Sequence, residues 1–190
     1  MELVDRAGRS DPDAWEALYR RAYPGLLAYA SRRLDAERAR DAVAETMARA
    51  VARISRFEWR TGSSFDGWLY GILRHVVIDA HRARSREAGR RQAIDASRAG
   101  PLDQVLDGEE ARAVREAFER LGDEDREVLE LRVVAGLSAE EVGTVLGKRA
   151  GAVRMAQSRA LERLRRELDR AHPWGPGAPG AGHELGGSER

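Results

Sequence analysis

The chain contains no cysteine among its 190 residues, which excludes disulfide bonds and zinc sites built from cysteine thiolates. It also has no run that approaches the roughly 20 apolar residues needed to span a bilayer. The amino terminus lacks the apolar core of a secretory signal. These absences predict a protein without membrane insertion that works in the cytoplasm.

Catalytic chemistry has equally little support in the sequence. The four histidines, at positions 75, 81, 172 and 183, have no carboxylates beside them at metal-ligand spacing. No glycine-rich phosphate loop and no nucleophile elbow occurs. The sequence therefore predicts no catalytic residue, no metal site and no cofactor, and a protein that is not an enzyme.

Charge is abundant but balanced. Charged residues make up 34% of the chain, yet the formal net charge is +1. The chain as a whole therefore attracts phosphates only weakly, and a nucleic-acid surface must come from local clustering of basic residues.

The first part of the chain has the apolar spacing of a small helical domain, predicted over residues 10–86 after a flexible terminus at 1–9. Asp11 followed by Pro12 is typical of a helix start. A second helix is predicted from about Ala36 to Arg56. Two stripes are expected to face the core, namely Trp15, Leu18, Tyr19 and Ala22 in the first helix, and Val43, Met47, Ala50 or Val51, and Ile54 in the second.

A third helix, near residues 65–84, is predicted to form the centre of this domain, with Ser63 or Ser64 as its cap. Its apolar residues recur at helical spacing and share one face: Phe65, Trp68, Leu69, Ile72, Val76 and Ala80. The remaining face is aromatic and basic: Tyr70, Arg74, His75, His81, Arg82 and Arg84, with Phe57 and Trp59 upstream. Such a mixture is either a solvated basic face or a surface that stacks bases and holds a phosphate backbone.

Apolar periodicity fades after this helix, so residues 87–108 are predicted to form a flexible linker. A second helical domain is predicted over residues 109–170, in which Asp123 or Asp125 is expected to cap a helix. Proline and glycine are dense in the last residues, and 171–190 is predicted to be a disordered tail with Trp174 as its one anchor.

The most specific pattern in the chain lies within the second domain. Ser138 and Glu141 have the spacing of a capping box, and Gly147 is placed to end a short helix. A longer helix over about 150–170 follows, so the pair predicts a helix-turn-helix whose second helix can enter a major groove. Its DNA-facing residues are expected to be Arg149, Arg154, Gln157, Ser158 and Arg159, and its inward residues Val153, Ala156 or Ala160, Leu161, Leu164 and Leu168. The alternative is an ordinary helical hairpin with surface arginines.

The predicted fold class is therefore all-α, with two small helical domains joined by a flexible linker and a helix-turn-helix in the second. Several motifs carry a family resemblance: Trp68-Leu69-Tyr70 with Asp79 and Arg82, Arg126-Glu127-Val128-Leu129, Gly136-Leu137-Ser138, Val153-Arg154 and Arg159-Ala160. With these motifs, residues from about 10 to 168 resemble an extracytoplasmic-function sigma factor, the minimal class of bacterial transcription initiation factors. Such proteins keep the second and fourth regions of larger sigma factors, and the linker here has no room for the third.

The resemblance implies three sets of binding residues. Core RNA polymerase would be bound, at the clamp helices of its largest subunit, by Asp41, Ala44, Glu45 and Arg49. The minus-ten element of promoter DNA would be read and melted by Phe57, Trp59, Arg74, His75, Val76, Asp79 and Arg82. The minus-thirty-five element would be read, beside the flap of the second-largest subunit, by Arg149, Arg154, Met155, Gln157, Ser158 and Arg159. An anti-sigma factor is a further expected partner.

Three positions depart from the family pattern. Ala44 stands where glutamine is frequent, His75 where asparagine is frequent, and Lys148-Arg149 where an isoleucine-serine pair is frequent. His75 changes what a captured base meets, because an imidazole and an amide offer different donors and acceptors. The third departure removes the usual side-chain cap, so the start of the recognition helix can shift by a residue or two.

Two other functions are compatible with the same helices. A helix-turn-helix transcriptional regulator would act without replacing a sigma factor, with the first domain as its sensor. A helical adaptor would bind protein and no DNA. The absence of a recognisable ligand or phosphoacceptor pocket argues against the regulator, and specific initiation by purified polymerase is the property that separates all three.

Overall fold

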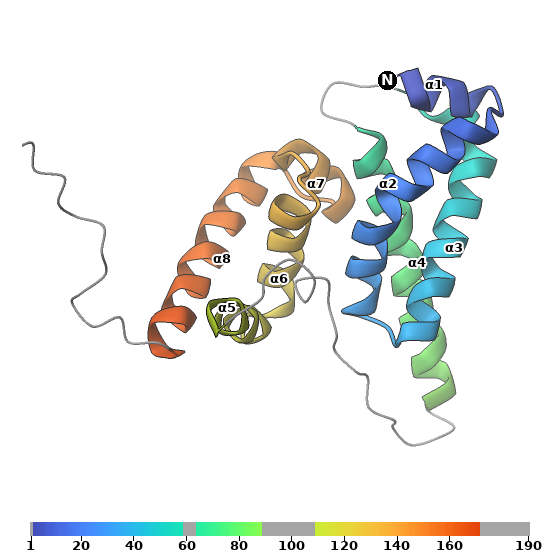
Figure 1. Cartoon of the computed structure of the whole chain (residues 1–190). Helices are drawn as coiled ribbons and strands as arrows, with labels where there is room; N and C mark the ends of the chain where they lie inside the picture. Colours follow the sequence, from blue (N-terminus) through green and yellow to red (C-terminus); the bar gives the residue numbers. More distant parts are fainter. Residues whose placement is uncertain (1, 59–63, 89–108, 172–190) are drawn as a thin grey trace, which may run out of the picture.

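The structure, a computed structural model, describes residues 2–58, 64–88 and 109–171, and these ranges contain helices and no strand (Figure 1). The predicted all-α class is confirmed. Trp59, Trp174, nearly all of the expected linker at 87–108 and nearly all of the expected tail at 171–190 lie outside the described residues.

Within residues 2–58 and 64–88, the amino-terminal half is a bundle of four helices and one short 3₁₀ turn (Figure 1). In chain order the elements are α1 (Glu2–Gly8), α2 (Pro12–Ser31), α3 (Ala36–Arg53), η1 (Ile54–Arg56) and α4 (Phe65–Ala88). A helix occupies most of the segment that was expected to be a flexible terminus. Val4 and Ala7 of α1 are buried, and Trp15 Nε1 donates to the Ala7 carbonyl at 3.0 Å, so α1 is held against α2.

Short-range caps set the starts of the long helices. The Asp11 carboxylate accepts from the backbone N–H groups of Asp13 and Ala14 at 3.0 and 3.2 Å, which confirms the predicted start of α2. The Ser64 hydroxyl accepts from the Gly67 N–H at 3.0 Å, as predicted for α4. Each cap satisfies backbone donors that the first helical turn leaves without an internal partner.

The core of this half largely follows the predicted stripes, with two corrections. Of the alternatives Ala50 and Val51, Ala50 is the buried one. Tyr19 was expected to face inward, but 43% of its surface is exposed. Tyr70 was assigned to the aromatic and basic face, whereas it is buried and meets Tyr29 edge to face at 5.8 Å between ring centroids. Helical spacing misassigns Tyr70 because three helices, α2, α3 and α7 (Ala139–Leu146), pack against α4, which widens its buried face.

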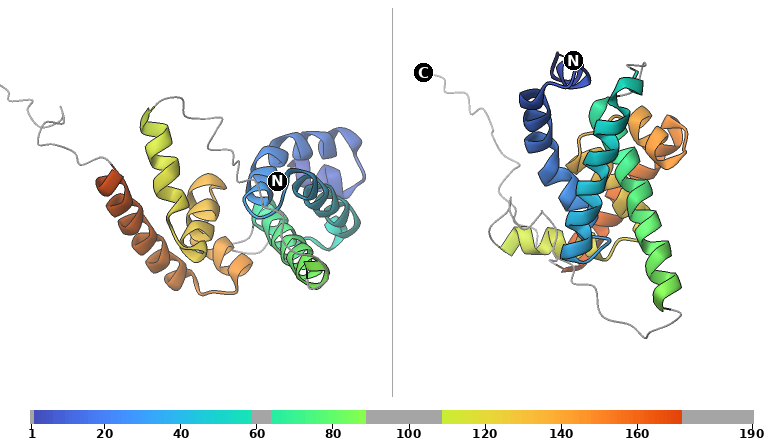
Figure 2. Two further views of the ribbon diagram at one scale, coloured as in Figure 1. Left: turned by 90° about the horizontal axis from the view of Figure 1, so that it is seen from below. Right: turned by 90° about the vertical axis from the view of Figure 1, so that its right-hand side faces the viewer.

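Within residues 109–171, the carboxyl-terminal half contains four α-helices and one π-helical turn; Figure 2 shows the arrangement of its helices. They are α5 (Glu109–Glu119), α6 (Asp123–Leu129), η3 (Glu130–Val134), α7 (Ala139–Leu146) and α8 (Ala150–Ala171). The expected aspartate cap of α6 is wrong, because Gly122 is the N-cap residue and no side chain caps the helix. Asp125 is instead buried and pairs with Arg163 of α8. Leu161, expected to face inward, is 44% exposed.

The helix-turn-helix of α7 and α8 is built as the sequence predicted. Ser138 Oγ accepts from the Glu141 N–H at 3.1 Å, and the Glu141 carboxylate accepts from the Ser138 N–H at 2.6 Å, which completes the capping box. Gly147 ends α7 with φ +67°, a left-handed conformation that favours glycine. The Lys148 N–H then donates to the Gly143 carbonyl at 2.8 Å, which closes the turn.

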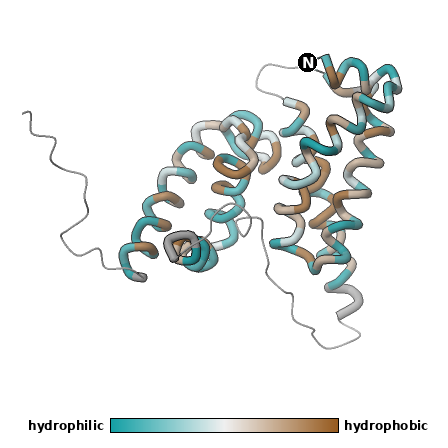
Figure 3. Tube along the Cα trace, in the orientation of Figure 1, coloured by the Kyte–Doolittle hydropathy of each residue, from teal (hydrophilic) through white to brown (hydrophobic). Residues whose placement is uncertain are grey.

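The two halves share one hydrophobic cluster. Leu137 and Val142 of the helix-turn-helix belong to the same buried cluster as Leu69 and Leu73 of α4, and α7 packs directly on α4. The hydropathy colouring shows apolar segments where the halves face each other (Figure 3). The helix-turn-helix is therefore packed against the amino-terminal bundle.

A substitution at Gly143 tests how tightly the turn of the helix-turn-helix is packed. A Cβ at this position would lie 2.6 Å from the Lys148 carbonyl oxygen, whereas a Cβ at Gly151 of α8 would meet nothing within 4 Å. We expect Gly143→Ala to lower the free energy of unfolding by about 1–3 kcal/mol, since backbone must move to admit the methyl group. The matched Gly151→Ala should be neutral or stabilising by up to about 1 kcal/mol. Equal melting temperatures for the two variants in thermal unfolding would contradict this account of the turn.

Candidate nucleic-acid interface

Three residues of the predicted minus-ten set form one exposed stripe on α4. His75, Asp79 and Arg82 are spaced by four and three residues, so they lie on one helical face. All three are exposed, and the Arg82 guanidinium is 3.8 Å from the Asp79 carboxylate. This outer stripe of α4 is accessible to a ligand without any rearrangement.

His75 is oriented by its own helix. Its Nδ1 lies 2.7 Å from the Gly71 carbonyl oxygen, one turn earlier. A carbonyl only accepts, so Nδ1 carries the hydrogen and Nε2 of the neutral ring is left as an acceptor. In its neutral form His75 therefore presents an oriented acceptor on the outer stripe, which suits a base amino group.

The other predicted minus-ten residues that the structure describes are not on this stripe. Val76 is 7% exposed and packs in the core, so its side chain cannot present itself to DNA in this arrangement. The Phe57 ring packs against Phe65 and Trp68 at centroid distances of 5.8 and 5.1 Å, so it anchors the segment after η1. Arg74 faces the other half of the molecule, where its Nε donates to Glu127 at 3.2 Å.

The predicted minus-thirty-five residues mostly line the exposed face of α8. This face, called the α8 stripe below, consists of Arg154, Met155, Ser158 and Arg159, all exposed, and Arg149 is exposed just before the helix. Gln157 differs from the expectation, because it is half-buried and its Oε1 accepts from Arg132 Nε at 2.8 Å. Arg132 also donates to the Leu137 carbonyl, so Gln157 takes part in holding the turn to α8.

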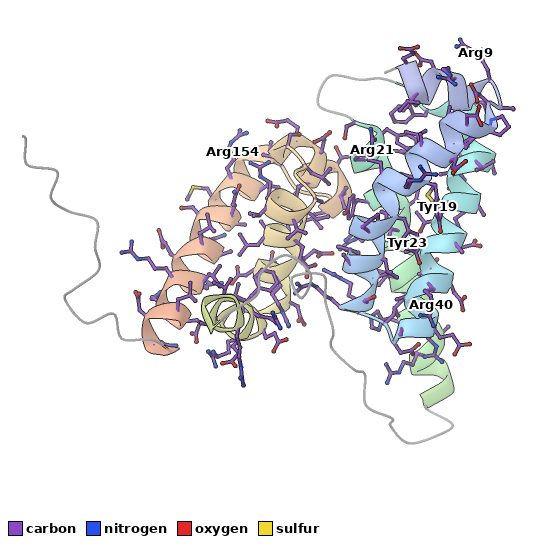
Figure 4. All side chains as sticks on the ribbon, viewed as in Figure 1. Arg9, Tyr19, Arg21, Tyr23, Arg40 and Arg154 are labelled. Atoms are coloured by element: carbon purple, nitrogen blue, oxygen red, sulfur yellow. The ribbon has the colours of Figure 1, made fainter. Side chains whose placement is uncertain are left out.

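Arg154 is one of the exposed guanidinium groups of the α8 stripe. It projects outward near the end of α8 that lies beside α7 (Figure 4). Its Nη1 donates to Glu140 Oε1 at 3.0 Å. The pKa of Glu140 lies below its ordinary value, because the backbone N–H of Glu140 and then Arg154 donate to the carboxylate. An exposed pair of this kind exchanges readily with another anion, such as a phosphate or a base edge.

The predicted polymerase-binding residues lie together on α3. Asp41, Ala44 and Glu45 are exposed, and Arg49 Nε donates to Glu45 at 2.7 Å. Beside them a groove of about 280 Å³ runs between α3 and α4. Its lining residues are Arg38, Asp41, Ala42, Glu45, Val76, Ala80, Ala83 and Arg84. A groove with an apolar floor and charged rims suits a helix from a partner protein.

Between the two halves lies a charged cluster that the sequence analysis did not identify. Tyr29, Arg32 and Arg33 come from α2 and its carboxyl end, and they meet Glu127 of α6 and Glu130 of η3. These partners are about 100 residues apart in the chain, and neither apolar spacing nor a motif relates them. The tertiary packing of the two halves brings them together.

Burial shifts the ionisation of this interdomain cluster. Burial alone lowers the pKa of Arg33, but the neighbouring Glu130 and Glu127 outweigh it, and the net pKa is raised. Burial raises the pKa of Tyr29, and Glu127 raises it further. The arginine therefore stays charged and the phenol stays protonated, as the hydrogen bonds in the cluster require.

Within residues 2–58, 64–88 and 109–171, no helix is long and apolar enough to cross a membrane, and no group of His, Asp and Glu is arranged to hold a metal ion. The same residues instead form surfaces suited to binding. These are two exposed polar stripes, on α4 and on α8, a groove beside α3, and a charged cluster between the halves.

The two halves match two protein-family models. Residues 18–87 match sigma-70 region 2, and residues 117–166 match sigma-70 region 4. The first range includes the outer stripe of α4 and the groove beside α3, and the second includes the helix-turn-helix.

Two curated relatives extend the likeness over most of the chain. The ECF RNA polymerase sigma factor SigD of Mycobacterium tuberculosis is 40% identical over 136 residues, which are 67% of this chain and 62% of SigD. The ECF RNA polymerase sigma factor ShbA of Streptomyces griseus is 34% identical over 177 residues, which are 86% of this chain and 92% of ShbA. The chain thus spans less than two thirds of the length of SigD and nearly all of ShbA.

Solved structures share the fold. The sigma factor RpoE of Bartonella quintana, solved with the anti-sigma factor NepR, is 28% identical with a TM-score of 0.67, over 81% of this chain and 96% of RpoE. CnrH, solved with the cytosolic domain of CnrY, has a TM-score of 0.62 at 24% identity, over 90% of this chain and 97% of CnrH. The second likeness concerns the fold alone.

Proposed function

Because this chain belongs to the extracytoplasmic-function sigma factors of the sigma-70 family, we propose that it directs core RNA polymerase to specific promoters and starts transcription there. The observation that carries the proposal is the presence, in one chain, of a helix-turn-helix with an exposed α8 stripe and a region 2 bundle with an exposed stripe on α4. In this proposal, α8 reads the minus-thirty-five element, and α4 captures unpaired minus-ten bases.

The proposed partners follow from the same surfaces. The groove beside α3, with Asp41 and Glu45 on its rim, receives the clamp helices of the largest polymerase subunit, and region 4 lies beside the flap of the second-largest subunit. RpoE was solved with an anti-sigma factor, and this chain is proposed to have an anti-sigma partner too. It acts in the cytoplasm as a binding protein with no catalytic residue of its own.

Run-off transcription is the direct test. Purified chain and core polymerase, incubated with genomic fragments, should give transcripts whose 5′ ends map to discrete positions that core polymerase alone does not use. A chain that binds DNA yet leaves the transcript pattern of core polymerase unchanged would be a helix-turn-helix regulator instead.

The docking face makes a prediction of its own. Asp41→Arg with Glu45→Arg should abolish binding to core polymerase while leaving the fold intact, because both side chains are exposed and the reversal opposes a basic partner. Loss of the Glu45–Arg49 pair within α3 should cost only about 0.2–0.5 kcal/mol. Pull-down with core polymerase measures it. The control is Glu16→Arg with Glu162→Arg, which changes the net charge equally at two other exposed sites and should bind normally. If Asp41→Arg with Glu45→Arg still retains core polymerase at the wild-type level, the docking face lies elsewhere on the molecule.

Arg154 should read a base edge. If so, Arg154→Ala costs about 1–3 kcal/mol of promoter binding and relaxes the preference at one minus-thirty-five position. Binding to a panel of single-base promoter variants measures both effects. The control Arg166→Ala removes the same charge from the other end of α8. It should either lower the affinity for all promoter variants equally or leave binding unchanged. An unchanged preference profile for Arg154→Ala would exclude this residue from base reading.

His75 should act in opening the minus-ten element. His75→Ala creates no cavity because the ring is exposed, so a structural role predicts nearly intact transcription. The sigma-factor role predicts weaker permanganate reactivity of minus-ten thymines on duplex DNA, with closed-complex binding retained. A template already unpaired at minus-ten should restore part of the run-off yield, since it removes the unpairing cost. If His75→Ala opens duplex DNA as well as the wild type does, His75 has no role in melting the minus-ten element.

A further inference from the structure

Glu140 of α7 is bonded to Arg154 of α8, so the contact joins the two helices of the helix-turn-helix. Arg154 Nη1 donates to Glu140 Oε1 at 3.0 Å. Glu140 lies in the first turn of α7, and Arg154 projects from the exposed α8 stripe (Figure 4). The two side chains are 51% and 60% exposed, respectively. The pair therefore lies on the surface that is proposed to meet DNA.

The start of α7 fixes the position of the Glu140 carboxylate. The capping box of Ser138 and Glu141 sets where this helix begins. The backbone N–H of Glu140 and then the Arg154 guanidinium donate to the carboxylate, and both lower its pKa, so it stays charged. The helix start thus supplies a positioned, charged acceptor for Arg154.

Stability gives no reason for this particular contact. An exposed ion pair contributes little to folding, because water and salt screen it. An acidic side chain interacts favourably with a helix N-terminus without any partner on another helix. Glu141 already caps α7. What the bond between Glu140 and Arg154 adds is a defined orientation of the guanidinium.

The bound guanidinium can still read a base. It has five N–H donors in a planar fork, and the bond to Glu140 uses one of them. Guanine offers O6 and N7 as two neutral acceptors in the major groove, which suit a bidentate contact with arginine. These acceptors can bind the remaining donors while Glu140 stays in place. A guanidinium that is already oriented also loses less side-chain freedom when it binds.

A phosphate meets the same pair on different terms. Its negative charge is repelled by the Glu140 carboxylate, so a phosphate must displace Glu140 to bind Arg154. One anion then replaces another, and little is gained. Guanine is neutral and adds to the pair without displacing the carboxylate. Glu140 therefore favours contact of Arg154 with a base edge over contact with the DNA backbone.

We propose that Glu140 is a positioning residue for base recognition, which orients Arg154 toward a guanine of the minus-thirty-five element and disfavours its contact with phosphates. The inference rests on the proposed function, because it concerns how α8 distinguishes promoter sequences. Glu140 acts through Arg154 and needs no contact of its own with DNA.

Two variants separate the orientation of Arg154 from the charge beside it. Glu140→Ala removes both the acceptor and the charge, whereas Glu140→Gln keeps an acceptor oxygen and removes the charge alone. Both should fold, because Glu140 is exposed and the capping box is unchanged. The chain on core polymerase is tested on a mapped promoter and its single-base minus-thirty-five variants. Glu140→Ala should lower the preference for guanine at the position read by Arg154 about fivefold. Glu140→Gln should retain most of this preference.

The control for base preference is Glu162→Gln. Glu162 is exposed on α8 about two turns beyond Arg154, so this variant changes the net charge by the same amount as Glu140→Gln near the same surface. It should leave the preference at every position unchanged. An unchanged preference in Glu140→Ala, or an equal loss in Glu162→Gln, would overturn the proposal.

Salt dependence tests the discrimination against phosphate. The probe is a 40-base-pair duplex of random sequence, bound by the full chain alone. In Glu140→Ala and Glu140→Gln no carboxylate repels a phosphate from Arg154, so the slope of log affinity against log salt should steepen by about 0.9. Glu162→Gln should keep the wild-type slope. A wild-type slope in both Glu140 variants would refute this part of the proposal.

A double variant tests whether Glu140 acts through Arg154. In the Arg154→Ala background, Glu140→Ala should cause no further change in base preference, because the residue that it positions is already absent. A further change would show that Glu140 contacts DNA directly, and would overturn the positioning role. Run-off transcription judges the proposed function separately. A sigma factor in which Glu140 has no role still initiates at discrete start sites, while Glu140→Ala leaves its base preferences unchanged.

Discussion

The arrangement of this molecule depends on the contact between two carboxylates of region 4 and three arginines of region 2. Glu127 and Glu130 hold Arg32, Arg33 and Arg74 in a largely buried network, next to the apolar packing of α7 on α4. Buried charges are costly unless they are paired. The carboxylates of one half therefore neutralise the arginines of the other. The helix-turn-helix is placed by this contact as much as by its own capping box.

Helix α4 connects the functions through its different faces. One face is core, and the outer stripe with His75 is open to solvent. A third face borders the groove beside α3, and a fourth carries Arg74 toward region 4. Because the residues of one helix move together, these four faces are fixed relative to one another.

Sequence reasoning predicted what is encoded locally. The Asp11 and Ser64 caps, the capping box at Ser138 and the end of α7 at Gly147 each depend on residues within a few positions of one another. It erred where tertiary packing decides, as in the burial of Tyr70, and it missed the interdomain cluster entirely. The Tyr29 to Glu127 hydrogen bond joins residues 98 positions apart, and no periodicity relates them. Of the candidate sites, the exposed stripes were predictable because helical spacing defines a face, whereas the partner of Arg74 was not.

Our central proposal is that one chain reads two promoter elements while it is bound to core polymerase. The most direct measurement is a nuclease footprint of the chain with core polymerase on a promoter fragment recovered by transcript mapping. We expect protection of both elements, whose centres lie about 25 base pairs, or about 85 Å, apart along the duplex. A transcribing complex that protects only one of the two elements would contradict it.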